Sequence, residues 1–187
     1  MARVGIFPGT FDPVHEGHIA FALQALQAAG LDRVVLVPEP WPRGKQCTAL
    51  AHRAAMLELA VAAHPQLSVL RATSRQFTVA RTLPELQASF PQDKLALLLG
   101  SDVLRGLARW PGLAALLAQM ELVAGLRASD TVTQADTLLR SLAGARFTII
   151  ESPHPHATSS VVRQGAHRQA MEPVAGYILQ NQLYAAA

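Results

Sequence analysis

The sequence has 187 residues, of which 50% are hydrophobic and 16% charged, so it can bury a core and does not belong to the disordered class. No apolar run approaches the ~20 residues that a membrane-spanning helix needs. The net charge of +3 comes from dispersed arginines and only two lysines, which suits a small anionic ligand better than a nucleic acid.

Strand-like and helix-like patterns alternate along the chain. In chain order we expect a strand at 4–7, a helix at 19–29, a strand at 34–37, a helix at 49–63, a strand at 67–70, a helix at 79–89, a strand at 95–99, a helix at 111–119, a strand at 122–124, a helix at 133–142, a strand at 147–150, and helices at about 160–170 and 173–182. In the helix at 49–63, the side chains expected to face the core are Met56, Leu57, Leu59 and Ala60.

These strand–helix units contain strands that are apolar on both faces, which predicts a parallel sheet covered by helices on both sides. We therefore expect an α/β doubly wound fold in a single domain, 1–187, whose last two helices, about 160–187, form a small C-terminal helical extension. Ligands of such folds bind beyond the carboxyl ends of the strands. The positions to search follow Phe7, Val37, Leu99 and Ile150.

The segment 9–18, Gly-Thr-Phe-Asp-Pro-Val-His-Glu-Gly-His, follows the first expected strand and has the clearest chemistry. Thr10 offers a hydroxyl and an amide, and Gly17 leaves space at the start of the next helix. His15 and His18 are three residues apart, so in a helical turn their rings face the same side. The helix N-terminus adds amide donors and the positive end of a dipole. The segment therefore predicts a site that stabilises charge on a reacting phosphate.

Other interpretations of this segment have less support. A metal site would need a third protein ligand, and none is evident in the sequence. Core histidines are the second alternative, but the adjoining glycine, aspartate and proline favour a loop. Gly5 and Gly9 do not match the dinucleotide-binding fingerprint, and Gly44-Lys45 is not a P-loop because Glu39 occupies the place of the first glycine.

The segment 9–18 resembles the histidine-x-glycine-histidine signature of the nucleotidyltransferase superfamily, which is shared with class I aminoacyl-tRNA synthetases. It is similar in particular to the form found in bacterial nicotinate-mononucleotide adenylyltransferases. The resemblance extends over nearly the whole chain. Further similar segments are a helix at 53–60 and Gly-Ser-Asp at 100–102, which resembles the family's glycine-x-aspartate. Residues 77–83, Phe-Thr-Val-Ala-Arg-Thr-Leu, resemble the segment where the family has tyrosine-threonine-x-x-threonine-leucine. Residues 158–163, Thr-Ser-Ser-Val-Val-Arg, resemble the family's second signature, serine-threonine-x-isoleucine-arginine.

The resemblance implies a Rossmann-like nucleotidyltransferase fold and transfer of the AMP part of ATP to nicotinate mononucleotide, with release of pyrophosphate, in NAD biosynthesis. It implies these catalytic residues: His15, His18, Thr10 and Arg163. The implied ATP-binding residues are Gly9, Phe11, Gly17, Gly100, Asp102 and Ser160. The implied acceptor-binding residues are Trp110, Thr78, Arg43 and Lys45.

Three of these assignments have a specific form. Asp102 would hold the ribose of ATP, with a helix-capping aspartate on the surface as the alternative. Trp110 would stack on the pyridine ring, with a core tryptophan as the alternative. Ser160 would open and cap a helix, from which Arg163, one turn on, would reach the β- and γ-phosphates. Mg²⁺ is the implied cofactor, held mainly by the phosphates of ATP, and no protein metal site is expected. The implied chemistry requires no role for Asp12 or Glu16.

Several segments depart from the family pattern. Residues 41–45 replace prolines followed by histidine and arginine, Phe77 replaces a tyrosine, residues 125–127 replace cysteine-arginine-arginine, and residues 157–158 replace isoleucine-serine. These departures leave the triphosphate site intact and the acceptor open. Nicotinamide mononucleotide, phosphopantetheine and a CTP-dependent cytidylyl transfer are alternatives, as is a nucleotide-binding module without catalysis. A tRNA synthetase is disfavoured because the chain is short.

The remaining features concern an exposed loop, the redox state, the cellular location and the partners of the protein. His154 and His156, which flank a proline, are interpreted as part of an exposed loop. Cys47 is the only cysteine, so no internal disulfide is expected. The N-terminal residues lack the pattern of a signal peptide, and a cytoplasmic enzyme is expected. The expected partners are ATP and a small phosphate acceptor, without nucleic acid or membrane, and an oligomer is compatible with the sequence.

Overall fold

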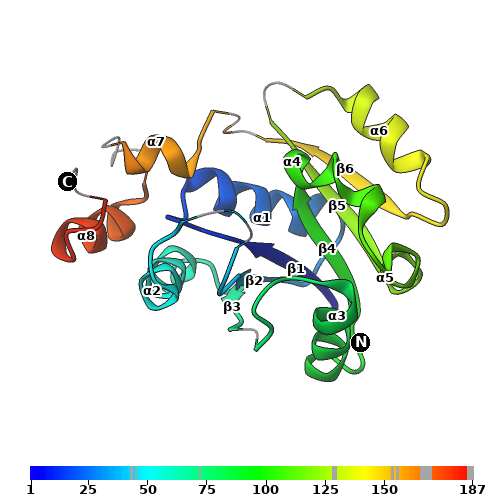
Figure 1. The fold of residues 1–187 in the computed structure, drawn as a ribbon, viewed down its shortest axis with the longest axis horizontal. Coiled ribbons are helices and arrows are strands. Elements are labelled where there is room, and N and C mark those ends of the chain that lie inside the picture. Colours follow the sequence, from blue (N-terminus) through cyan, green and yellow to red (C-terminus); the bar gives the residue numbers. More distant parts are fainter. Residues whose placement is uncertain are drawn as a thin grey trace.

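The computed structural model describes residues 1–42, 44, 46–71, 73–127, 130–152, 154, 156–164 and 170–184. One parallel sheet of six strands forms the centre (Figure 1). Its strands are β1 (Arg3–Gly9), β2 (Arg33–Pro38), β3 (Leu67–Val69), β4 (Lys94–Gly100), β5 (Met120–Leu126) and β6 (Phe147–Glu151). They lie in the order β3-β2-β1-β4-β5-β6, which is the order of doubly wound nucleotide-binding sheets. The predicted fold class is confirmed.

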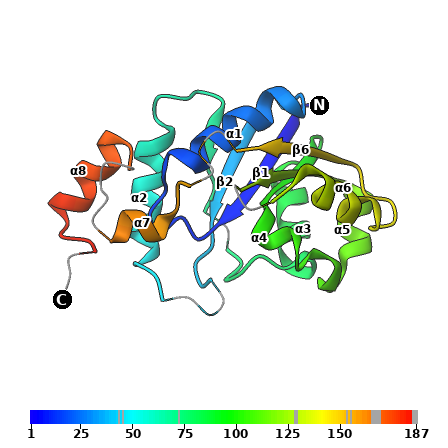
Figure 2. The same cartoon turned by 90° about the horizontal axis from the view of Figure 1, so that it is seen from above.

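Helices cover both faces of the sheet (Figure 2). The helices are α1 (Glu16–Ala28), α2 (Leu50–Val61), α3 (Val79–Ser89), α4 (Ser101–Leu104), η1 (Leu107–Arg109), α5 (Leu113–Gln119), α6 (Val132–Arg140), α7 (Ser159–Arg163) and α8 (Glu172–Gln180). Buried residues of α1, α2, α7 and α8 form one apolar cluster, and those of α3, α5 and α6 form another on the opposite face. Among the described residues, no helix is long and apolar enough to cross a membrane.

The strands are apolar throughout because both of their faces are buried. In β2, Val34 and Leu36 belong to the cluster with α1, while Val35 and Val37 belong to the cluster with α3. The same alternation runs through β4. Because side chains of a strand point to opposite faces in turn, a sheet between two helix layers needs uninterrupted apolar strands.

Two expectations about the helices are wrong, and two short elements were not expected. The helix expected at 160–170 ends at Arg163, where Gln164 forms its C-cap; residues 165–169 lie outside the described part, and Ala170 is not helical. Leu59 is 38% exposed, because it lies outside the stripe of α2 that Met56, Leu57 and Ala60 share. The short elements α4 and η1 were not expected, since one turn of helix is too short for a periodic pattern.

Candidate active site

The carboxyl ends of β1 and β4 lie side by side where the strand order reverses. β1 ends at Gly9 and β4 at Gly100, and β1 pairs with both β2 and β4. The chain continues from β1 into α1 on one face and from β4 into the helices of the other face. The two connections therefore diverge and leave a crevice, which is where ligands of such sheets bind.

The loop between β1 and α1 has an unusual backbone conformation. Phe11 has a φ of 48°, a value that aromatic residues rarely adopt. Its buried ring packs edge-on against Phe7, with ring centroids 5.3 Å apart, and against His18 at 5.0 Å. Gly9 is needed at the end of β1 because a Cβ there would lie 2.9 Å from the Phe11 ring. Gly9 thus leaves room for the Phe11 ring at the end of the strand.

Two histidines meet at the start of α1. His15 is the N-cap residue, and its backbone N–H donates to Nδ1 of His18 at 3.2 Å, while the two ring centroids are 3.7 Å apart. Because Nδ1 of His18 accepts this bond, its neutral ring carries the proton on Nε2. Burial, with a smaller contribution from Arg127, lowers the pKa of His15 to about 4. Burial and the neighbouring His15 also lower the pKa of His18 well below its usual value. Both rings are therefore uncharged near neutral pH.

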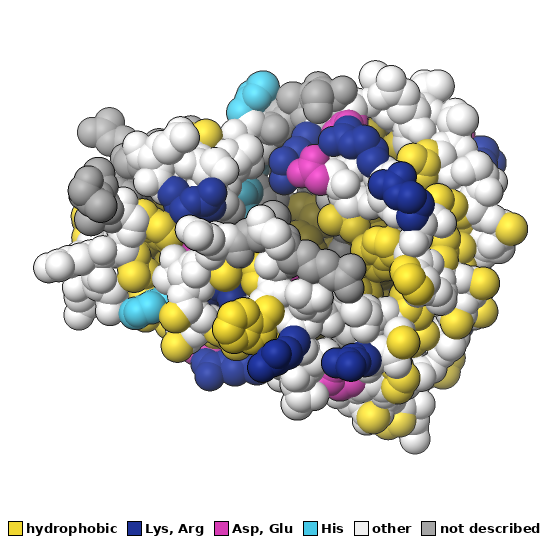
Figure 3. Space-filling view, viewed as in Figure 1, with side chains coloured by type: hydrophobic (Ala, Val, Ile, Leu, Met, Phe, Trp, Pro, Cys, Tyr) yellow, Lys and Arg dark blue, Asp and Glu magenta, His cyan; other side chains and the backbone are white. Residues whose placement is uncertain are grey.

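Two cavities meet at these histidines. The larger, of about 470 Å³, is also lined by Thr10, Ser160 and Arg163. The smaller, of about 200 Å³, lies over the ends of β1, β4 and β5 and is lined by glycines, namely Gly9, Gly17, Gly100 and Gly125. The side chains that line both cavities are Phe11, His15, His18, Asp102 and Arg127. Figure 3 shows a hollow near the middle of one face, with basic and acidic side chains gathered above it.

The second signature lies against the first. Arg163 Nη1 donates to the carbonyl of Asp12 at 2.6 Å, and its Nη2 donates to Oγ of Ser160 at 3.1 Å. The hydroxyl of Ser159 donates to the carbonyl of Pro13 at 2.9 Å. These contacts bring α7 to the loop before α1 and place Arg163 in the larger cavity.

The expectation that Ser160 caps α7 is wrong. The N-cap is Thr158, whose hydroxyl accepts from the N–H of Val161 at 3.3 Å. Thr158 has the extended backbone that an N-cap needs, with φ −137° and ψ 145°, whereas Ser160 already lies in the first turn. The hydroxyl of Ser160 is thereby left to accept from Arg163.

Arg53 of α2 also holds the loop before α1. Its side chain is fully buried and donates to three backbone carbonyls, those of Thr48 at 2.8 Å, Thr10 at 2.7 Å and Pro40 at 3.2 Å. Sequence reasoning interpreted this helix as core packing and missed the role. An arginine within the apolar face of a helix was the signal that could have found it.

Comparisons with known proteins agree with this geometry. A family model described as cytidylyltransferase-like matches residues 6–165. A curated Bordetella pertussis protein named as a probable nicotinate-nucleotide adenylyltransferase is 35% identical over 98% of both chains. A protein of the same name from Symbiobacterium thermophilum is 32% identical over 98% of this chain and 96% of its own. The chain belongs to the nicotinate-nucleotide adenylyltransferase family. It is therefore an enzyme of the nucleotidyltransferase class.

Solved structures support the same fold. Plasmodium falciparum nicotinic acid mononucleotide adenylyltransferase complexed with NaAD has a TM-score of 0.84 at 16% identity, covering 98% of both chains. The same enzyme complexed with APC has a TM-score of 0.81 at 15% identity, with equal coverage. At this identity the likeness concerns the fold alone, and it agrees with the Rossmann-like fold that the sequence implied.

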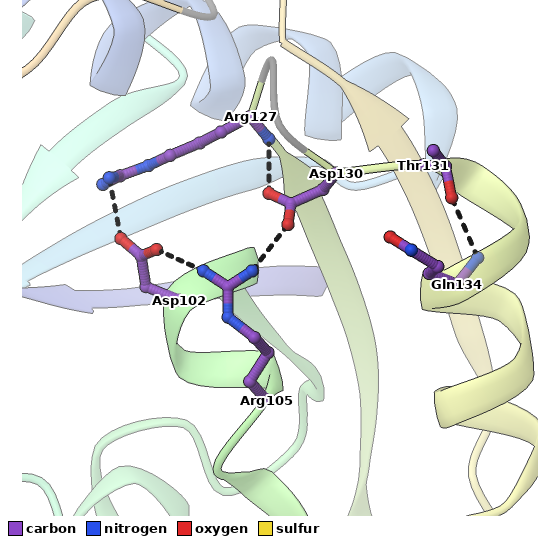
Figure 4. A network of polar contacts seen from close by, with 6 residues as sticks. All are labelled: Asp102, Arg105, Arg127, Asp130, Thr131 and Gln134. Carbon is purple, nitrogen blue, oxygen red and sulfur yellow. Dashed lines mark hydrogen bonds and ion pairs between the residues drawn. The ribbon is translucent and has the colours of Figure 1, made fainter.

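In this adenylyltransferase family member, an arginine network borders both cavities (Figure 4). Arg127 Nη1 lies 2.7 Å from one carboxylate oxygen of Asp102, and Arg105 Nη2 lies 3.0 Å from the other. Arg105 also pairs with Asp130 at 2.7 Å, and the N–H of Arg127 donates to Asp130 at 3.3 Å. Asp102, implied to hold ribose, thus lies at the site but is bound to two arginines. Sequence reasoning did not select Arg127, although its position at the end of β5 was a signal for it.

The adenylyltransferase residues implied for the acceptor are more scattered. Arg43 and Lys45 lie outside the described residues. Thr78 lines a third cavity of about 550 Å³, together with Trp41, Arg75, Gln76 and Arg81. In the described part of the chain, Trp110 lines none of these three cavities. Its ring lies 5.7 Å from that of Phe77 and packs against the core.

His154 lies closer to the candidate site than sequence reasoning expected. It is exposed, as interpreted, but it also lines the smaller cavity, with Nδ1 4.0 Å from a carboxylate oxygen of Glu16. Its position after β6 again follows the rule that strand ends border the site.

Proposed function

We propose that this chain transfers the AMP part of ATP to nicotinate mononucleotide and releases pyrophosphate, as a step of NAD biosynthesis. The observation that carries the proposal is the pair of uncharged histidines, His15 and His18, at the start of α1, facing a cavity that also contains Arg163. The names of the most similar curated relatives support the same reaction.

The chemistry needs no general base. The acceptor phosphate has a second pKa of about 6, so it is largely ionised near neutrality. One of its oxygens forms a bond to the α-phosphorus of ATP while the bond from that phosphorus to the bridging oxygen of the β-phosphate breaks. Pyrophosphate leaves with the electron pair. The residues of the chain therefore act by positioning the phosphates and by stabilising charge in the transition state.

Each cavity suits one part of ATP. We place the phosphates in the larger cavity, where Nε2–H of His18, the hydroxyl of Thr10 and the guanidinium of Arg163 are available. We place the nucleoside in the smaller cavity, where Gly100 has open space beside it and permits close approach of a ring. Asp102 borders both cavities and would bind the ribose if the ligand displaced one of its arginines.

Mg²⁺ fits this arrangement as a cation held by the phosphates and water. No group of three or more acidic, histidine or cysteine side chains that could hold a metal is present among the described residues, so phosphate oxygens are the fitting ligands. When bound, the ion would neutralise charge on the leaving pyrophosphate. His18, Thr10 and Arg163 would still orient the triphosphate.

For the acceptor we propose the cavity lined by Thr78, with Trp41 in place of Trp110 as the aromatic side chain. Arg75 and Arg81 beside Thr78 supply guanidinium groups that suit a carboxylate or phosphate, and the exposed ring of Trp41 offers an aromatic surface. A recess lined by Pro8 and Gln76 lies between this cavity and the smaller cavity, since it shares one residue with each. The guanidinium groups of Arg75 and Arg81 would bind the carboxylate of nicotinate mononucleotide, so we expect this acceptor to be preferred over nicotinamide mononucleotide, which has an uncharged amide.

The test is pyrophosphate release from ATP and Mg²⁺ with several acceptors in parallel: nicotinate mononucleotide, nicotinamide mononucleotide and phosphopantetheine, with CTP as a second donor. We expect release with nicotinate mononucleotide and at least about tenfold less with the amide, because a lost charged hydrogen bond is worth about 1.5–3 kcal/mol. If pyrophosphate is released only with phosphopantetheine, the acceptor must be reassigned. If it is released only with CTP, the nucleotide donor must be reassigned. ATP binding without release from any acceptor would indicate a non-catalytic module.

A further inference from the structure

Asp12 is a buried carboxylate for which the proposed chemistry has no use. Its side chain is 4% exposed, and it lies in the loop between β1 and the two histidines. Burying a carboxylate is unfavourable unless hydrogen bonds compensate for the lost water. Its partners therefore show what the residue does.

Both carboxylate oxygens of Asp12 have donors from distant parts of the chain. Oδ1 accepts from the hydroxyl of Tyr184 at 2.6 Å, and Oδ2 accepts from the N–H of Thr48 at 3.2 Å. The carbonyl of the same residue accepts from Arg163 at 2.6 Å. Asp12 thus connects the segment after α8 to the arginine that lines the larger cavity.

The burial and the backbone conformation of Tyr184 support its contact with Asp12. Tyr184 is partly buried against the apolar cluster of α1 and α2, and burial together with the Asp12 hydrogen bond raises the pKa of its hydroxyl. Tyr184 also has a φ of 60°, a conformation that is uncommon outside glycine. Phe11, which directly precedes Asp12 in the sequence, has a φ of 48°. Contacts must hold the loop in this sparsely populated conformation.

We propose that Tyr184 is a positioning residue for ATP: through Asp12 it holds the loop before α1 and the guanidinium of Arg163 in the geometry that binds the triphosphate. This inference rests on the proposed function, and it assigns a role in that function to the segment after α8. Without the hydroxyl, Asp12 would reorient to regain a donor and its carbonyl would move away from Arg163.

Tyr184→Phe tests the proposal, and Tyr177→Phe is its matched control. Tyr177, on α8, also makes a hydroxyl hydrogen bond, to Nδ1 of His52 at 2.9 Å, but that bond joins α8 to α2. We expect Tyr184→Phe to lower kcat/KM for ATP by roughly 10-fold, as the loss of a hydrogen bond to a charged group does, with KM for the acceptor within about twofold. Tyr177→Phe should lower only the melting temperature.

A second measurement uses the unmodified chain and remains decisive if Tyr184→Phe does not fold. Binding free energies are reciprocal, so if Tyr184 strengthens ATP binding, ATP must strengthen the Tyr184 contact. Amide hydrogen exchange in the segment 181–184, where the N–H of Leu183 donates to the carbonyl of Ile178, should slow when Mg²⁺ and ATP are added without acceptor. Unchanged exchange there would overturn the inference.

The outcomes separate this inference from the proposed function. If the unmodified chain binds ATP, and Tyr184→Phe lowers the melting temperature while leaving kcat/KM for ATP unchanged, Tyr184 is merely structural and the inference is wrong. If the unmodified chain binds no ATP in calorimetry, the proposed function itself is wrong.

Discussion

At the scale of single residues, the proposed site contains two imidazoles that carry no charge near neutral pH. A neutral ring at a helix N-terminus donates a hydrogen bond without the desolvation that a buried cation would require. We expect His18→Ala to lower turnover by at least ~10², because removal of one donor to a developing charge usually has that effect. Pyrophosphate release measures this, and circular dichroism should show an unchanged fold. His64→Ala, on the turn after α2, is the control and should retain activity. Near-normal turnover of His18→Ala would contradict the proposed mechanism.

The lowered pKa of His15 predicts a dependence of stability on pH. The folded value is about 4 and the ordinary value 6.5, so between these limits the unfolded chain binds more protons than the folded one. The free energy of unfolding therefore falls as pH drops below 6.5, by about 1.4 kcal/mol per pH unit for this group. Urea unfolding at pH 7.5, 6 and 5 should show a shallower decline for His15→Gln. Parallel profiles would show that the buried imidazole does not contribute.

At the scale of elements, Arg53 couples α2 to the loops that follow β1 and β2. Arg53→Met leaves three partly buried backbone carbonyls without their donor, each loss being worth about 1 kcal/mol or more. We expect the free energy of unfolding to fall by about 3 kcal/mol in urea titrations. Arg71→Met is a matched control, because Arg71 is 62% exposed and pairs only with the exposed Glu58 among the partners described. Its effect should stay within about 0.5 kcal/mol.

At the scale of the whole molecule, the larger cavity joins the two ends of the fold. The contact between Asp12 and Arg163 closes a separation of 151 residues, so a ligand that fills this cavity stabilises the whole domain. ATP with Mg²⁺ at about 100 times its Kd should raise the free energy of unfolding by about 2.7 kcal/mol. Arg163→Met should show a smaller rise in melting temperature at the same ATP concentration. An equal rise would place the triphosphate elsewhere.

Much of this structure was predictable from local patterns. The strands at β2 and β4 were expected because their residues are apolar on both faces, and segment 9–18 indicated a phosphate site because its donors lie within one turn of a helix. The boundaries of α7 were less predictable. Both Thr158 and Ser160 are good N-cap residues, and the contacts of Ser159 with Pro13 and of Arg163 with Asp12 accompany the start that the chain adopts.

The sequence by itself determined the fold class, the succession of strands and longer helices along the chain, and the cluster of donors at the start of α1, because each depends on residues close together in the chain. Only the tertiary structure decided that Arg53 holds the loop before α1, that Arg127 borders both cavities, and that Tyr184 binds Asp12. Those contacts join segments that are far apart in sequence. The packing of the sheet and its two helix layers brings these segments together. The local periodicity of the sequence does not predict that packing.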